Sequence, residues 1–274
     1  MYTQNLHVHT TYCDGKNTPE ELVQKAVSLG MHSIGFSGHS YMSFYPSISM
    51  SIAGTEEYKK EIARLKEAYR EKIEIFCGLE MEMYSECSLE GFDYLIGSVH
   101  YFNFNGEKVG MDRGADEVKR IIDVYFGGDG MAYAEEFYRQ ASLLSNYGKF
   151  DIIGHFDLLT KHSEKASFFD TASLRYRTAA IDALREVAKG IPLFEVNSGA
   201  IARGYRTTPY PAPFLLDECK RLGLGAVISS DCHNKEDLLC YFKESAAYLE
   251  AHGFRYVYVL TQEGFKPVKI EEFI

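Results

Sequence analysis

The sequence lacks the features that mark membrane proteins, nucleic-acid-binding proteins and disulfide-linked proteins. No uninterrupted apolar run reaches the roughly 18 residues that a membrane-spanning helix needs. Lys and Arg number 29 against 39 Asp and Glu, and no dense basic run occurs, so the net charge of −10 disfavours long nucleic acids and anionic membranes as partners. A small-molecule partner remains, and an anionic one would need a local source of positive charge.

Paired cysteines are also missing. The six cysteines are scattered and form no C-x-x-C motif. The first residues have neither the basic head nor the apolar run of a secretory signal. We therefore expect reduced thiols and a cytoplasmic location. No oligomeric state follows from the sequence.

Short apolar runs alternate with longer helical patterns along the chain, and no Pro-, Gly- or Ser-rich linker interrupts them. The runs are rich in Ile, Val, Phe and Tyr and have no clean polar face, which is typical of parallel strands covered on both sides. Thr18-Pro19-Glu20-Glu21 has the residues of an N-cap, a first-turn proline and a capping box, and Gly30 ends that helix. The alternation predicts one closed β/α barrel over residues 1–274 rather than two domains. The predicted strands are Asn5–His9, Ser33–His39, Ile73–Met83, Tyr94–His100, Asp151–His155, Pro192–Asn197, Gly225–Asp231 and Tyr256–Leu260.

One stretch does not follow this rhythm. Residues 101–130 are rich in glycine and show no steady periodicity. The stretch is either an insertion or a long loop between a strand and a helix near the active face, and periodicity alone does not decide between the two.

Six of the nine histidines fall at or just after the ends of the predicted strands. In a β/α barrel the carboxyl ends of the strands form the rim where catalytic groups gather. His7 and His9 are two residues apart, so the alternation of a strand turns both imidazoles to one face. Asp231 and His233 repeat this spacing near the other end of the chain. The six histidines are His7, His9, His39, His100, His155 and His233.

Carboxylates accompany these histidines. Glu80 lies near the end of the third predicted strand, and Asp14 lies in the first loop. Imidazole nitrogen and carboxylate oxygen bind zinc, manganese or iron, and a carboxylate can bridge two ions. The set has too many donors for one ion, so we predict two or three divalent ions of zinc, manganese or iron. The candidate metal ligands are His7, His9, Asp14, His39, Glu80, His100, His155, Asp231 and His233.

These candidates belong to motifs with a fixed order along the chain. The motifs are His7-Val8-His9-Thr10 with Asp14, Gly38-His39, Gly78-Leu79-Glu80, Gly97-Ser98-Val99-His100, Ile153-Gly154-His155 and Ser230-Asp231-Cys232-His233. Their order resembles that of the PHP (polymerase and histidinol phosphatase) superfamily, and the match covers nearly the whole chain. Within the superfamily, the length and the strand Glu195-Val196-Asn197 are similar to those of the stand-alone L-histidinol-phosphate phosphatases.

The resemblance implies a distorted (β/α)7 barrel, the TIM-like PHP fold, which holds a trinuclear metal site. By position in the motifs, His7, His9, Glu80 and Asp231 would hold one ion, Glu80 would bridge to a second ion held by His100 and His155, and Asp14, His39 and His233 would hold the third. The presence of these groups on the rim follows from the spacing, whereas the assignment to individual ions follows only from the resemblance.

The activity that the resemblance implies is hydrolysis of a small phosphate monoester, L-histidinol phosphate, to L-histidinol and phosphate by attack of metal-bound hydroxide. Glu80, Asp231 and His233 are the candidate catalytic residues, and the group that protonates the leaving alkoxide stays open. An alternative with the same chemistry is a PHP phosphoesterase acting on nucleotides or other small phosphate esters. A non-catalytic metal-binding module would be expected to lack some ligands, and this sequence has all of them.

Basic side chains near two of the motifs are candidates for holding the phosphate. Lys161 follows the fifth motif by a few residues, where related phosphatases place an arginine, and Arg203 or Arg206 follows the strand that contains Glu195. Glu195 and Asn197 are candidates for binding the amino group of histidinol or for supporting a metal ligand from behind.

Other side chains near the rim have two interpretations each. Glu82 shares a strand face with Glu80, so it either faces the site or supports it from behind. Four tyrosines are candidates for the pocket wall, although most tyrosines cover the core and keep one edge in water. They are Tyr41, Tyr45, Tyr101 and Tyr205.

Overall fold

A barrel of parallel strands forms the centre of the computed structural model, which describes residues 1–273. Seven strands lie in the order β1-β2-β3-β4-β7-β8-β9, each parallel to its neighbour. A parallel bridge between Val8 and Cys232 brings the segments after the first and last strands together, so the sheet is nearly closed. The strands are β1 (Gln4–Asn5), β2 (Ser33–Phe36), β3 (Glu74–Glu82), β4 (Tyr94–Ser98), β7 (Ile152–Ile153), β8 (Leu193–Asn197) and β9 (Gly225–Ser229). The predicted distorted (β/α)7 barrel is confirmed.

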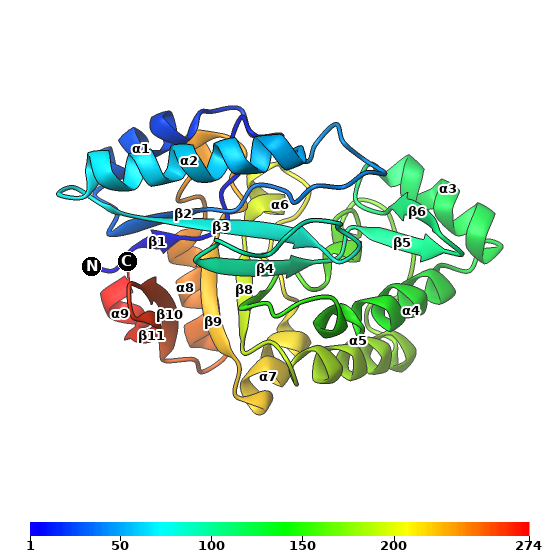
Figure 1. Ribbon diagram of the computed structural model, residues 1–274. Coiled ribbons are helices and arrows are strands. Elements are labelled where there is room, and N and C mark those ends of the chain that lie inside the picture. The colour runs from blue at the N-terminus through cyan, green and yellow to red at the C-terminus, as the bar shows by residue number, and fades with distance from the viewer. Residues whose placement is uncertain (274) are drawn as a thin grey trace.

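Helices surround the barrel, with α1 and α2 along one side and α5 and α7 on the opposite side (Figure 1). The helices are α1 (Pro19–Ser28), α2 (Ile52–Tyr69), α3 (Ala115–Phe126), α4 (Gly130–Ala141), α5 (Leu174–Val187), α6 (Gly199–Ala202), α7 (Pro213–Leu222), α8 (Phe242–Ala251) and α9 (Ile270–Phe273). Short 3₁₀ helices cover Leu144–Asn146, Leu158–Thr160 and Lys235–Asp237. No helix within residues 1–273 has both the length and the apolar character needed to cross a membrane.

The start of α1 has the capping box that the sequence predicts. The Thr18 hydroxyl accepts a hydrogen bond from the backbone N–H of Glu21, and the Glu21 carboxylate accepts one from the backbone N–H of Thr18. Pro19 occupies the first helical position, where its missing N–H costs nothing. Gly30 follows the last turn with a positive φ of 68°, which glycine adopts without strain. This helix is therefore defined largely by its own local sequence.

A cluster of buried apolar side chains, most of them from the barrel strands, packs together in the interior, and Tyr94 is the largest of them. Its hydroxyl donates to the backbone carbonyls of Leu6 and Phe36. A Cβ at Gly35 in β2 or at Gly78 in β3 would lie within 2.5 Å of the Tyr94 side chain, so both strands need glycine at these positions to leave room for it. This packing closes the barrel beneath the rim.

The structure differs from two sequence-based expectations. The run Tyr256–Leu260 is a strand, β10 (Tyr256–Thr261), but it forms an antiparallel hairpin with β11 (Gly264–Lys269) instead of joining the barrel. Only a short turn separates these two strands, and so short a connection permits only antiparallel pairing. The hairpin closes the amino-terminal end of the barrel, where the Gln4 side chain hydrogen-bonds to the backbone of Leu260. The sequence pattern after Asn234 predicts a helix there, but helix α8 begins only at Phe242, behind a 3₁₀ turn.

The irregular stretch 101–130 is an insertion with structure of its own. It consists of the hairpin β5 (Tyr101–Phe104) and β6 (Glu107–Gly110), followed by α3. The hairpin and α3 project from one end of the barrel (Figure 1). The chain returns to the barrel directly after β6, because the Met111 N–H donates to the His100 carbonyl at 2.9 Å. The insertion therefore contributes to the rim on which the histidines lie.

Candidate metal centre and substrate pocket

The predicted ligand residues meet at the carboxyl end of the barrel. Each follows a parallel strand or lies near its end, and such ends converge in a closed barrel. The first pair of histidines follows β1, Glu80 lies in β3, and Asp231 and His233 follow β9. The side chains brought together are His7, His9, Asp14, His39, Glu80, His100, His155, Asp231 and His233.

Glu80 is at the centre of this cluster and is buried. Its Oε2 lies 2.9 Å from His39 Nδ1, and its Oε1 lies 2.9 Å from His155 Nε2. Its two oxygens lie within 3.5 Å of imidazole nitrogens of His7, His9, His39, His100 and His155. A carboxylate with both oxygens surrounded in this way can bridge two ions.

Two further carboxylates complete the cluster on the side of β1 and β9. Asp14 Oδ2 lies 3.4 Å from His233 Nε2 and 3.7 Å from His39 Nε2. Asp231 Oδ1 lies 3.4 Å from His9 Nε2 and 3.5 Å from His233 Nδ1. Three groups have ligand atoms that all lie within 4.8 Å of one another: His9, Asp14, His39 and His233; His7, Glu80 and His155; and His7, His9 and Asp231.

Several ligand atoms in the cluster are buried without a hydrogen-bond partner. Such an atom costs free energy unless another group satisfies it. The atoms are His7 Nε2, His9 Nε2, His39 Nδ1, His155 Nδ1, Asp14 Oδ1 and Glu80 Oε2. The close approach of His39 Nδ1 and Glu80 Oε2 does not have the geometry of a hydrogen bond. The unsatisfied atoms are nitrogen and oxygen donors of the kind that zinc, manganese and iron accept, so the residues fit a group of divalent ions.

Without metal, the electrostatics differ from one ligand to the next. Burial would lower the pKa of His7, His39 and His100, but Glu195, Glu80 and other nearby carboxylates raise it, so metal binding there would displace protons. Burial lowers the pKa of His9 to about 3, with help from the nearby His233 and His39. Burial would raise the pKa of Glu80, but His7, His39 and other imidazoles hold it well below its usual range. A neutral imidazole and an ionised carboxylate are the forms that coordinate metal ions.

Glu195 lies behind His7. His7 Nδ1 is 2.8 Å from Glu195 Oε2, which also accepts a hydrogen bond from the Ser229 hydroxyl at 2.6 Å. The other oxygen, Oε1, accepts hydrogen bonds from the backbone N–H of His155 at 2.6 Å and from the side-chain amide of Asn197 at 2.9 Å. Because an ionised carboxylate only accepts hydrogen bonds, the neutral form of His7 would carry its proton on Nδ1 and direct the lone pair of Nε2 into the cluster.

These contacts change the interpretation of two predicted substrate-binding residues. Glu195 and Asn197 are both buried, and neither lines the pocket described below. The contacts of Glu195 correspond to the supporting role considered from the sequence, and a contact with substrate would have to break them. Ser229, which completes this network, was not anticipated because a serine inside a strand gives no signal of its own.

Glu82 has the same relation to His100. Its Oε2 accepts a hydrogen bond from the His100 backbone N–H at 2.7 Å and lies 3.0 Å from His100 Nδ1. The carboxylate therefore leaves His100 Nε2 free to face Glu80. Of the two positions considered for Glu82, the structure shows the one behind the ligand.

A pocket of about 230 Å³ opens above the cluster. Its basic side chains are Lys161 and Arg203, and Asp112 lies beside Lys161. Of the four tyrosines considered, Tyr101 and Tyr205 line the pocket. The rest of the wall is apolar and consists of Met42, Ile48 and Leu158.

Arg203 is held in place by the segment that follows β9, the last strand of the barrel. Its guanidinium donates to the Asp231 carbonyl at 2.9 Å and to Asp231 Oδ2 at 3.0 Å, and it lies 3.2 Å from His233 Nδ1. A Cβ at Gly199 would lie 3.0 Å from this guanidinium, so glycine gives the arginine room. Arg206 instead bonds Thr160 in a neighbouring cavity. Of the two arginines considered for the phosphate, only Arg203 lines the pocket.

Lys161 lines the same pocket from the segment after β7. Its Nζ donates to the Asp112 carbonyl at 2.7 Å, lies 3.3 Å from Asp112 Oδ2, and sits 4.9 Å from the ring centre of Tyr205. Asp112 was not anticipated, because it lies in the stretch without periodicity. Its only signal in the sequence was the expectation that this stretch is near the active face.

The comparisons with known proteins agree with this geometry. The model of the PHP domain family matches residues 5–199. The histidinol-phosphatase of Bacillus subtilis is 25% identical over 264 residues, which cover 87% of this chain and 96% of that protein. The histidinol-phosphatase of Lactococcus lactis is 22% identical over 260 residues, which cover 89% of each chain.

The fold is also found among solved structures. The crystal structure of histidinol phosphate phosphatase from Lactococcus lactis, complexed with zinc, L-histidinol and phosphate, superposes with a TM-score of 0.73 at 20% identity and covers 96% of this chain and 98% of that one. This likeness shows that the two chains share a fold. Because the family model extends over more than half of the sequence, from β1 to the end of β8, the chain belongs to the PHP domain family.

Proposed function

We propose that this protein is a metal-dependent phosphomonoesterase that hydrolyses L-histidinol phosphate to L-histidinol and phosphate. The observation that carries the proposal is the convergence of imidazole and carboxylate donors around Glu80, with buried ligand atoms left unsatisfied, directly beneath a pocket that contains Lys161 and Arg203. The curated relatives named histidinol-phosphatase, and the related structure that holds L-histidinol, support the choice of substrate.

The metal ligands in this proposal are the nine side chains of the cluster. Divalent cations held there would lower the pKa of bound water and neutralise charge on the phosphate oxygens. The geometric groups agree in part with the assignment implied by the resemblance: Asp14, His39 and His233 fall in one group, although His9 joins them as well. Glu80, near members of every group, remains the proposed bridge.

The residues behind the ligands would keep the imidazoles in place. Glu195 fixes the tautomer and orientation of His7, and Glu82 does the same for His100. Carboxylates in this position orient the imidazole and raise its basicity as a ligand.

The phosphate would lie between Arg203 and Lys161, above the metal cluster. Both side chains line the pocket, Arg203 from the loop after β8 and Lys161 from the loop after the neighbouring strand β7. Burial would raise the pKa of Asp231, but Arg203 and the neighbouring histidines hold it well below its usual range. Asp231 is therefore ionised, as a ligand to a cation must be, and the group that protonates the leaving alkoxide stays open.

The substrate is tested with a panel of phosphomonoesters on the purified protein loaded with divalent metal. We expect kcat/KM for L-histidinol phosphate to exceed that for nucleoside monophosphates by about 100-fold or more, because discrimination by polar contacts in a closed pocket reaches this range. Phosphate release is the measurement. Preferential hydrolysis of nucleotides would instead favour the alternative PHP phosphoesterase.

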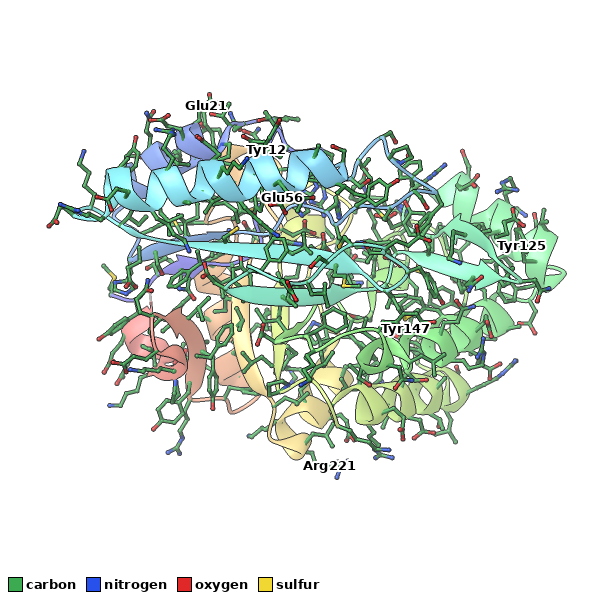
Figure 2. The ribbon with its side chains drawn as sticks, in the orientation of Figure 1. Tyr12, Glu21, Glu56, Tyr125, Tyr147 and Arg221 are labelled. Atoms are coloured by element: carbon green, nitrogen blue, oxygen red, sulfur yellow. The ribbon has the colours of Figure 1, made fainter. Side chains whose placement is uncertain are left out.

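The role of Arg203 is tested with Arg203→Met. A hydrogen bond to a charged group contributes about 1.5–3 kcal/mol, so KM for the substrate and the inhibition constant of inorganic phosphate should both rise by about 10-fold or more. Arg221→Gln is the control, since Arg221 lies at the end of α7, pairs with Glu218 and points away from the barrel (Figure 2). If both constants stayed the same in Arg203→Met, Arg203 would not bind the phosphate.

A further inference from the structure

Asp112 places a negative charge in a pocket that is proposed to bind an anion. Within the described chain it is the one pocket-lining carboxylate outside the three donor groups of the metal cluster. It lies beside Lys161 and also acts on the guanidinium of Arg203, whose pKa it helps to raise. A carboxylate near both basic groups weakens their attraction for phosphate. Asp112 would be better explained if it bound a further cation, in addition to Lys161 and Arg203.

The Asp112 carboxylate has capacity for another partner. Lys161 Nζ makes its short bond, 2.7 Å, to the backbone carbonyl of Asp112, whereas the distance to Oδ2 is 3.3 Å. Charge-assisted hydrogen bonds are normally about 2.7–2.9 Å long, so the side-chain contact is weak. Within residues 1–273, Oδ1 accepts no hydrogen bond, and 35% of the side chain is exposed.

The position of Asp112 is fixed by the inserted hairpin. The preceding residue, Met111, bonds the backbone of His100 at 2.9 Å. A Cβ at Gly110 would lie 3.1 Å from the Tyr101 ring, so the end of β6 packs closely on the aromatic wall of the pocket. Asp112 therefore follows directly after a residue whose backbone is bonded to a candidate metal ligand, which limits how far its main chain can move relative to the cluster.

The charge state of Asp112 is that of a cation binder. Burial raises the pKa of its carboxyl group, but Lys161 and His100 outweigh this effect and lower the pKa below its ordinary value. The group is therefore ionised near neutral pH. It can accept hydrogen bonds from an ammonium group, and it holds no proton to donate to a leaving group.

We infer that Asp112 binds the ammonium group of the substrate and makes the enzyme selective for phosphate monoesters of amino alcohols over those of uncharged alcohols. This inference rests on the proposed phosphomonoesterase function and specifies its substrate class. The phosphate lies between Lys161 and Arg203, the ammonium group contacts the free oxygen of Asp112, and the remainder of the substrate packs on Tyr101, Tyr205 and Leu158. L-Histidinol phosphate has this arrangement, with an ammonium group close to the phosphate ester.

The test compares two substrates that differ only in the ammonium group: L-histidinol phosphate and the phosphate ester of 3-(imidazol-4-yl)propan-1-ol. We expect the wild-type enzyme to prefer the amino substrate in kcat/KM by about 10-fold to 100-fold, and Asp112→Asn to reduce this preference at least about 10-fold. Asp112→Glu, which keeps the charge, should retain part of the preference. Asp116→Asn is the matched control, because this exposed aspartate in the first turn of α3 undergoes the same chemical change outside the pocket.

The inhibition constant of inorganic phosphate separates ammonium binding from positioning of Lys161. If Asp112 only held Lys161 in place, Asp112→Asn would weaken phosphate binding and lower kcat/KM for both substrates by the same factor. That result, or an unchanged preference, would overturn the inference.

Failure of the proposed function gives a different pattern. If the wild-type enzyme did not hydrolyse histidinol phosphate but hydrolysed another amino-alcohol phosphate, such as phosphoethanolamine, with a preference that Asp112→Asn removes, the inference would stand and the named substrate would fall. If the wild-type enzyme hydrolysed histidinol phosphate while Asp112→Asn kept the full preference, only the inference would fall. If no amino-alcohol phosphate were hydrolysed, both would fall.

Discussion

Glu80→Gln is expected to lower kcat by about 1,000-fold or more and to remove bound metal from the protein. Glu80 is the side chain that the clustered imidazoles share, with two oxygens at 2.9 Å from His39 and His155. An amide removes the negative charge and replaces one acceptor with a donor, so it can neither bridge two cations nor balance their charge. Loss of charge stabilisation in a buried catalytic site has effects of this size.

Glu74→Gln is the matched control for this substitution. Glu74 begins the same strand at the opposite end, is partly exposed and lies 3.6 Å from His32, far along β3 from the cluster. Metal content, kcat and the melting temperature are measured on both variants. Full activity and full metal content in Glu80→Gln would remove Glu80 from the centre of the site.

Metal removal is expected to abolish activity and to destabilise the fold together. A ligand that binds only the native state stabilises it by about 2.7 kcal/mol at a free concentration 100 times its dissociation constant. In a chain of this size such a change corresponds to a shift in melting temperature of about 5 °C or more. Readdition of zinc, manganese or iron(II) should restore both activity and stability, and the metal that restores most activity is the best candidate for the native one.

The stability measurement makes this prediction independent of the substrate. Thermal unfolding of the chelated and reloaded protein tests the metal site even if histidinol phosphate is not the substrate. The control is Glu80→Gln, in which added metal should raise the melting temperature less than in the wild type. A chelated protein with unchanged melting temperature and unchanged phosphate release would contradict both parts of the prediction.

The positions of the metal-ligand candidates could be predicted because strand geometry is local. Two residues of spacing put His7 and His9 on one face, and parallel strands end on one rim, so the convergence of distant motifs follows from the fold class alone. The start of α1 is equally local, because Thr18 and Glu21 satisfy each other's backbone groups. For these features the sequence pattern and the tertiary structure depend on the same few residues.

Periodicity does not show how far a side chain lies below the rim or which strand and side chains it contacts, and the expectations that the structure changes are of these two kinds. The position of Glu195 near the end of a predicted strand indicates that it lies close to the metal ligands. It does not show that Glu195 contacts His7 and Ser229 below the rim. The apolar pattern of Tyr256–Leu260 predicts a strand but not its partner, and a short turn decided the pairing. Asp112 reaches the pocket through a hairpin, so its position depends on contacts with His100 that no local pattern encodes.

The organisation of the chain as a single domain also remains a proposal. It is supported by the way β10 closes the amino-terminal end of the barrel, where Leu260 packs with Leu6 and Tyr94 in the barrel interior. The two ends of the described chain meet beside this hairpin, where the Tyr2 N–H donates to the Glu272 carbonyl at 2.9 Å.

Anomalous diffraction from a crystal grown with zinc, manganese or iron(II) tests the central claim most directly. The account predicts two or three peaks among the nine side chains, with Glu80 between two of the ions and Glu195 and Glu82 still bonded to His7 and His100. A well-ordered crystal with full-strength side-chain density and no peak at this end of the barrel, at millimolar metal, would contradict it.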